Sequence, residues 1–110
     1  MNEVVLIGSE TLGNGDEQLG RLLMGNMLRI MGEKPELPKY VILWNSGVKI
    51  ATPRSAAVVH LKDLADKGVT VISCGTCVEF FDLASEMTVG EVDGMSRILD
   101  ILQSHDVLTV

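Results

Sequence analysis

The chain has 110 residues and a formal net charge of -6 at pH 7, which is the size of one domain with a single core. An acidic chain is a poor partner for nucleic acids and anionic membranes, because binding to phosphate groups requires clustered Lys and Arg. No apolar run approaches the roughly 20 residues of a membrane span, and no basic segment precedes a signal-like core. We therefore expect one cytoplasmic domain over residues 1–110, without nucleic-acid or membrane partners.

The first predicted strand and helix are separated by a loop rich in glycine. Residues 4–7 are four consecutive apolar residues, typical of a strand covered on both faces. After the loop 8–15, Asp16 and Glu17 are expected to begin a helix that runs to about Met31. The stripe expected to pack on the sheet is Leu19, Leu22, Leu23, Met27 and Ile30. The second stripe, which indicates a subunit contact, is Met24, Leu28 and Met31.

The second strand and helix follow a break. Two prolines and a glycine end the first helix, and residues 40–44 predict the next strand. A loop with polar groups at its head covers residues 45–51. Thr52 and Pro53 are suited to the N-cap and the first helical position, and predict a helix that ends at Gly68.

The last part of the chain repeats the alternation of strand and helix. Residues 69–74 predict a buried strand, followed by a short helix to about residue 85. A weaker strand is predicted at 88–92, then a helix capped by Asp93, and a final strand at 107–110. The alternation predicts an α/β fold with a mostly parallel five-stranded sheet and helices on both faces.

Both cysteines of the chain lie in one turn. Cys74 and Cys77 follow the strand 69–74 directly, in a Cys-x-x-Cys motif. If Thr76 or Cys77 opens the next helix, its free backbone N–H groups favour thiolate over thiol. In a reducing cytoplasm this placement indicates chemistry and not a structural disulfide.

Three loops are expected to share the edge formed by the carboxyl ends of the strands, where such sheets bind ligands near the reversal of strand order. They cover residues 8–15, 45–52 and 74–77. Lys49 is the cation placed to stabilise a thiolate or to attract an anionic sulfur species, but a solvated loop charge is the preferred interpretation, because Lys is mostly exposed. Gln18 stands where a dinucleotide motif requires glycine, so no nucleotide cofactor is expected. The candidate binding residues are Asn45, Ser46, Gly47, Lys49, Gly75 and Thr76.

The two thiols permit four interpretations. Zinc usually needs four ligands, and beyond the cysteines the chain offers only the distant His60 and His105, so no metal site is expected. Two unreactive core thiols and a thioredoxin-type dithiol remain open. The favoured interpretation is a nucleophilic cysteine that carries sulfur as a persulfide, with the second thiol able to resolve it.

Three segments together resemble one family. GNGDEQLG (13–20), WNSGVK (44–49) and SCGTC (73–77) are similar, in this order, to the DsrE/DsrF-like domain of the YedF proteins, which are sulfurtransferase-like proteins linked to selenium metabolism. The resemblance implies a flavodoxin-like three-layer domain, assembled as a homotrimer or hexamer, that handles sulfur or selenium on a cysteine. It matches Cys74 to the active cysteine and Cys77 to the accessory thiol.

Many YedF proteins also carry an N-terminal TusA-like domain, which residues 1–110 do not include. The expected sulfur partner is therefore either such a domain outside these residues or a separate TusA-like or other sulfur-carrier protein. The sequence thus predicts a sulfur-relay protein, either a carrier or a sulfurtransferase-like enzyme, in which Cys74 accepts sulfane sulfur and passes it on. Two alternatives stay open: a dithiol oxidoreductase that uses Cys74 and Cys77, and a non-catalytic regulatory scaffold assembled through the Met-rich helix face.

Overall fold

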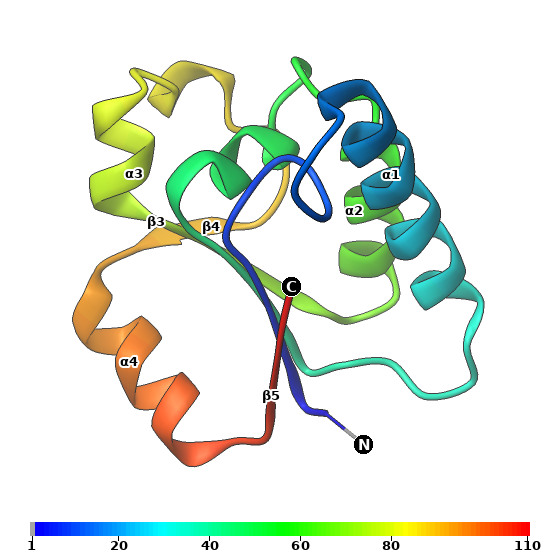
Figure 1. Ribbon diagram of the computed structural model, residues 1–110. Helices are drawn as coiled ribbons and strands as arrows, with labels where there is room; N and C mark the ends of the chain where they lie inside the picture. Colours follow the sequence, from blue (N-terminus) through cyan, green and yellow to red (C-terminus); the bar gives the residue numbers. More distant parts are fainter. Residues whose placement is uncertain (1) are drawn as a thin grey trace.

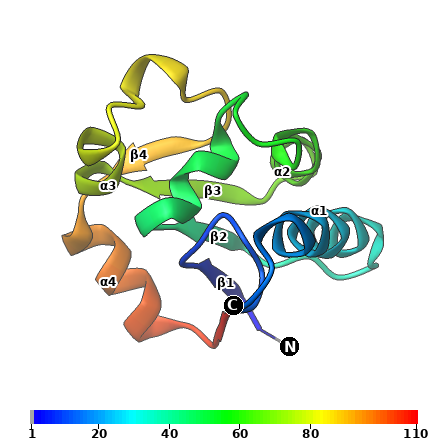
Figure 2. The ribbon, with the colours of Figure 1, turned by 45° about the horizontal axis from the view of Figure 1, so that its top comes forward.

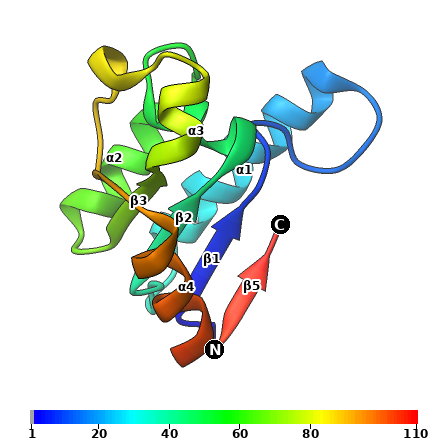
Figure 3. The same ribbon diagram turned by 90° about the vertical axis from the view of Figure 1, so that its left-hand side faces the viewer.

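A parallel sheet organises the molecule (Figure 1). The computed structural model describes residues 2–110, and within them the sheet has five strands in the order β4-β3-β2-β1-β5, with every pair parallel. The strands are β1 (Val4–Ile7), β2 (Tyr40–Leu43), β3 (Thr70–Cys74), β4 (Glu91–Asp93) and β5 (Val107–Thr109). Figure 3 shows β1 and β5 side by side and pointing the same way. The predicted α/β fold is confirmed, with a sheet that is parallel throughout.

Helices cover both faces of this sheet, as the continuous apolar strands require. Figure 2 shows α1 (Glu17–Glu33) and α2 (Val58–Asp66) on one side and α4 (Met95–Ser104) on the other. The short helix α3 (Gly75–Phe80) continues directly from β3, and 3₁₀ helices η1 (Asn45–Ala51) and η2 (Ala84–Glu86) complete the chain. None of the helices between residues 2 and 110 combines the length and apolarity needed to cross a bilayer.

Side chains of alternate strand residues pack into two separate cores, one on each face of the sheet. Val5 and Ile7 of β1 contribute to the core beneath α1 and α2, together with Met24 and Leu28. Val4 and Leu6 contribute to the core beneath α4. This alternation follows from the period of two in a strand. It also determines which of the two cores a cysteine at the end of a strand can contact.

The packed stripe of α1 is the opposite of the predicted one. The buried residues of the helix are Gly20, Met24, Leu28 and Gly32, so the Met24 stripe faces the core. The stripe predicted to pack on the sheet contains the exposed residues Leu19, Leu22, Leu23 and Ile30. Gly20 and Gly32 explain the difference. An added Cβ would lie 2.7 Å from Thr11 Cβ at Gly20, and 2.8 Å from Asp63 Oδ2 at Gly32, so glycine on this face permits close packing.

Two predicted helix boundaries, one predicted N-cap and one predicted loop also differ. Asp16 caps α1 as predicted, since its side chain accepts a hydrogen bond from the Leu19 N–H at 2.8 Å. However, α2 begins at Val58 and not at Pro53, because Thr52 and Ser55 use their hydroxyl groups in local turns. Residues 45–51 form η1 and not an open loop, and α3 ends at Phe80. The N-cap of α4 is Gly94 and not Asp93, because Asp93 belongs to β4.

Candidate functional site

Three loops meet at the carboxyl ends of β1, β2 and β3. The backbone N–H of Glu10, in the loop after β1, donates to Ser46 Oγ at 3.3 Å, and Ser46 Oγ donates to Ser9 Oγ at 3.5 Å. The backbone N–H of Asn45, after β2, donates to Cys77 Sγ at 3.0 Å. The predicted juxtaposition of these loops is therefore present. The thiols follow β3, however, whereas the strand order reverses at β1 and β5, so the site lies away from the switch point where we expected it.

Cys74 is buried in the core beneath α4. It is the last residue of β3 and lies on the same side of the strand as Ile72, so it joins the cluster that contains Ile98 and Ile101. Only 1% of Cys74 is exposed. The thiol that the sequence matched to the active cysteine is thus closed to solvent in this chain.

Cys77 is the accessible thiol. It is the third residue of α3 and is partly exposed, while it also packs against the core that contains Cys74. Its sulfur accepts the Asn45 N–H described above. Asn45 has a φ of 51°, a left-handed conformation that Asn tolerates better than most residues. Backbone in this sparsely populated region often occurs where a functional group must be positioned, and here it directs an amide at sulfur.

A pocket of about 260 Å³ opens beside Cys77 and is lined by Asn45, Thr76, Cys77, Phe80 and Phe81. It is small compared with pockets of about 300–1,000 Å³ that hold drug-sized ligands. The rings of Phe80 and Phe81 stand edge to face, 5.2 Å apart, and Phe80 is 81% exposed. Aromatic edges interact favourably with sulfur, so the pocket suits a small sulfur-containing group bound at Cys77.

Lys49 lies behind the pocket and not inside it. Its Nζ is 4.6 Å from the centre of the Phe81 ring and 3.9 Å from Glu10 Oε1. The ring and the carboxylate both attract the ammonium group. Lys49 therefore supports the Phe81 wall, and Glu10 is a partner that the sequence analysis did not single out.

The remaining predicted binding residues have structural contacts. Gly47 is buried, and a Cβ there would lie 2.4 Å from the carbonyl oxygen of Ile7, so only glycine lets η1 approach β1. Gly75 lies against the end of β4, where an added Cβ would be 3.4 Å from the carbonyl oxygen of Asp93. Ser46 joins the first two loops, and Thr76 lines the pocket.

The environment of Cys77 disfavours its ionised form. Burial raises the pKa of the Cys77 thiol above its ordinary value, the Asn45 amide lowers it, and the adjacent Cys74 thiol raises it again. The net direction is upward, so the thiolate-favouring environment expected from the helix N-terminus is not found. Burial is the largest of these effects.

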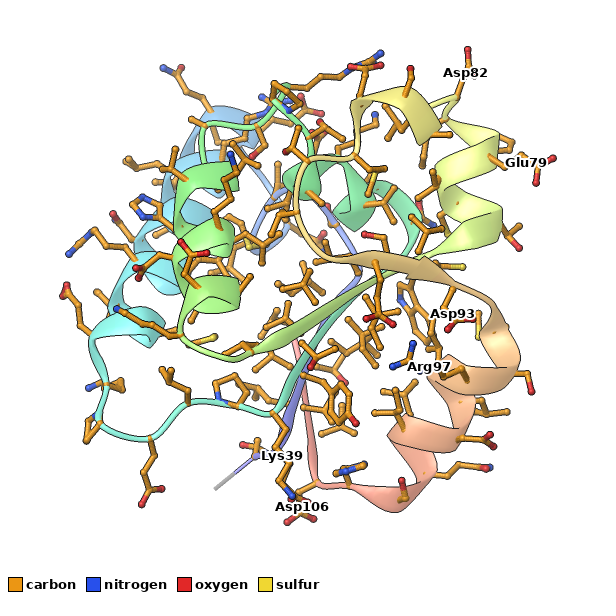
Figure 4. The ribbon with its side chains drawn as sticks, turned by 180° about the vertical axis from the view of Figure 1, so that it is seen from behind. Lys39, Glu79, Asp82, Asp93, Arg97 and Asp106 are labelled. Carbon is orange, nitrogen blue, oxygen red and sulfur yellow. The ribbon has the colours of Figure 1, made fainter. Side chains whose placement is uncertain are left out.

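The acidic residues next to the motif do not enter the pocket. Glu79 and Asp82 are exposed, and Figure 4 shows both pointing away from the molecule at the α3 end. Their charges are therefore screened by water before they can act on Cys77.

The described residues bring no further metal ligands to the thiols. His60 lies on α2, and His105 follows α4, where its ring packs edge to face on Tyr40 at 5.4 Å. Between residues 2 and 110 no group of three or more His, Cys, Asp or Glu side chains is arranged to hold a metal ion.

Comparison with solved structures shows the same fold in three small proteins. YchN from E. coli superposes with a TM-score of 0.72 and 15% identity over 100% of both chains. MTH1491 from Methanobacterium thermoautotrophicum has a TM-score of 0.69 and 17% identity, covering 97% of this chain and 96% of its own. BT1422 from Bacteroides thetaiotaomicron has a TM-score of 0.59 and 19% identity, covering 98% of this chain and 95% of its own. The last two are described as proteins of unknown function.

No protein-family model and no curated protein matches the sequence. At identities of 15% to 19%, the comparisons establish the flavodoxin-like fold and leave the chemistry to be argued from the site.

Proposed function

We propose that the protein relays sulfane sulfur, and that Cys77 carries it as a persulfide. The observation that supports this most is the geometry at Cys77, where a partly exposed sulfur accepts an amide hydrogen bond and lines a small aromatic pocket. The resemblance to DsrE/DsrF-like domains points to the same chemistry. Relative to the sequence prediction, the roles of the two thiols are exchanged, because Cys74 is buried.

The loading step requires no cofactor. The Cys77 thiolate attacks the terminal sulfur of a donor persulfide, the new S–S bond forms at Cys77, and the donor leaves as a thiolate. The Asn45 N–H stabilises negative charge on Cys77 Sγ before the attack. The terminal sulfur then occupies the pocket between Thr76 and the two phenylalanine rings.

The acceptor is a thiol on another protein, in the reducing cytoplasm that the chain is expected to occupy. A TusA-like or other sulfur-carrier protein fits this role, and the chemistry is the same for sulfur and selenium. An acceptor thiol that enters the pocket from solvent meets the terminal sulfur first, so the sulfur moves on in its sulfane form. The chain is then a carrier or a sulfurtransferase-like enzyme that works as a homotrimer or hexamer.

Intact-mass spectrometry tests the proposal. Reduced wild-type protein, a Cys77→Ser variant and a Cys74→Ser variant are each incubated without oxygen with cysteine persulfide. We expect the wild type and Cys74→Ser to gain the mass of one sulfur atom, and Cys77→Ser to gain none. If neither the wild type nor Cys74→Ser takes up sulfur, or if Cys77→Ser takes up as much as Cys74→Ser, Cys77 is not the carrier. A signal that disappears only in Cys74→Ser would restore the original assignment.

A further inference from the structure

The two thiols occupy opposite sides of the same sulfur site. Cys77 lines the pocket, and Cys74 does not. Cys74 instead belongs to the core beneath α4, against which Cys77 also packs. Cys77 therefore lies between the pocket and the core that contains Cys74.

Cys74 is protected from every thiol except its neighbour. With 1% of the residue exposed, it cannot be reached by a donor or acceptor protein without local unfolding. Cys74 is the N-cap of α3 and Cys77 is the third residue of the helix, so one turn separates them. Disulfides span Cα separations of about 4.4–6.8 Å, and residues one helical turn apart fall in this range.

We propose that this site has a second activity, in which Cys74 reduces the sulfur held on Cys77 and releases it as hydrogen sulfide. The inference rests on the proposed function, because it starts from the Cys77 persulfide. It adds a reaction that a relay protein does not need.

The step balances without an external oxidant or reductant. The sulfur of Cys74 attacks Cys77 Sγ, a bond forms between the two cysteines, and the bond between Cys77 Sγ and the terminal sulfur breaks. The terminal sulfur leaves with the electron pair of the broken bond and takes up the proton of the Cys74 thiol, so it departs as H₂S. The sulfane sulfur is reduced by two electrons, and the two cysteines are oxidised to a disulfide. A dithiol reductant returns the protein to its starting state.

The direction of approach decides the fate of the sulfur. A thiol that enters through the pocket meets the terminal atom and takes it as sulfane sulfur, whereas Cys74 on the core side meets the inner atom and displaces the terminal atom as sulfide. An acceptor must therefore act before the internal thiol does. The protein thus divides persulfide sulfur between transfer to a partner and reduction.

A single-turnover experiment tests this step. Reduced full-length protein is loaded with cysteine persulfide without oxygen, freed from excess donor, and followed by intact mass and by trapping of sulfide with monobromobimane. The variants are Cys74→Ala, which leaves no second thiol, and Cys77→Ser, which cannot be loaded. Circular dichroism establishes that each variant is folded, and unloaded wild type incubated in parallel must stay reduced.

We expect the loaded wild type to convert into a species lighter than the reduced protein by two hydrogens, with one sulfide released per chain. Peptide mapping should place the disulfide between Cys74 and Cys77. Loaded Cys74→Ala should keep its sulfur at least about tenfold longer, because an internal thiol acts at an effective concentration of millimolar or more.

The outcomes separate the two proposals. If neither the wild type nor Cys74→Ala takes up sulfur, the relay function itself fails. If both take it up and lose it at equal rates, or if the wild type forms no disulfide, the relay stands and the reduction step is overturned. Should Cys74→Ala fail to fold, the wild type alone still tests the reduction step, because that step predicts both the loss of two hydrogens and the release of one sulfide per chain.

Discussion

At the scale of single residues, the position of a thiol relative to β3 matters more than the motif that contains it. Cys74 still belongs to the strand, so it follows the alternation that sends Ile72 into the core. Cys77 belongs to α3 and turns toward the pocket. The same two residues therefore have separate environments, one apolar and closed, the other partly open and hydrogen-bonded.

The pKa of Cys77 leads to a pH-dependent prediction. Because burial and the Cys74 thiol raise this pKa, less thiolate is present at neutral pH than in an unperturbed cysteine. Alkylation of Cys77 by iodoacetamide should be slow at pH 7, rise by about tenfold per pH unit, and level off only above the ordinary thiol pKa. Peptide mapping assigns the modified site.

The Cys74→Ala variant serves as the matched control for this measurement. It removes a neighbour that raises the Cys77 pKa, so its alkylation profile should move to lower pH and its rate at pH 7 should increase. A wild-type midpoint at or below that of a cysteine-containing peptide would contradict the assigned environment.

The placement of both cysteines at the end of a strand could be predicted from the residues, but their different exposure could not be resolved by the motif alone. Two cysteines after a β-branched run indicate a site at a strand end. Which sulfur faces the pocket depends on where β3 stops and α3 begins, and that boundary falls between Cys74 and Gly75. The Asn45 amide depends on a backbone conformation that has no signature beyond the residue type.

At the scale of elements, η1 fixes the geometry of the site because it carries Asn45 and Lys49 and rests directly on β1. The contact depends on Gly47, where a Cβ would lie 2.4 Å from the Ile7 carbonyl oxygen. The backbone of a central strand cannot move to make room for a Cβ without a cost in stability. Any side chain at position 47 therefore forces η1 away from the sheet and moves the Asn45 amide away from Cys77.

A pair of glycine substitutions measures this contact. Gly47→Ala should lower the free energy of unfolding by about 1–3 kcal/mol, the usual cost of overpacking. Gly25→Ala is the matched control, since an added Cβ at Gly25 in α1 meets nothing within 4 Å. It should raise the stability by about 0.5–1 kcal/mol through the helix preference of Ala. Urea unfolding followed by circular dichroism reports both, and equal values would show that η1 does not depend on Gly47.

The elements were predictable where their patterns were unambiguous. The apolar run of β1 and the β-branched run of β3 specified strands covered on both faces, and the alternation with helices specified the sheet. The orientation of α1 was not predictable from hydrophobicity, because both of its stripes are apolar. Gly20 and Gly32, spaced four residues from Met24 and Leu28, were the signal for the packed face, since small residues mark close contacts.

At the scale of the whole molecule, the reversed orientation of α1 leaves an apolar surface uncovered. Leu19, Leu22, Leu23 and Ile30 are exposed on it. A hollow of about 660 Å³ lies beside them, between α1 and the start of α2, with Leu19, Leu22 and His60 in its lining. Large contiguous apolar patches on a soluble protein mark interaction surfaces. We therefore expect the proposed self-association to use this face, opposite the stripe first predicted for it.

A charge at the centre of this face tests the expectation. Leu22 is 62% exposed, so Leu22→Glu should change the stability of the single chain by less than about 0.5 kcal/mol. In an assembled interface the buried carboxylate costs more than about 2 kcal/mol, which weakens association by at least about thirtyfold.

The matched control is Leu99→Glu on α4, where Leu99 is 47% exposed, because it places the same charge on another face. Sedimentation velocity at micromolar concentration should show oligomers for the wild type and Leu99→Glu, and smaller species for Leu22→Glu. A monomeric wild type, or a Leu22→Glu variant that stays assembled, would show that the exposed face of α1 does not form the contact between subunits.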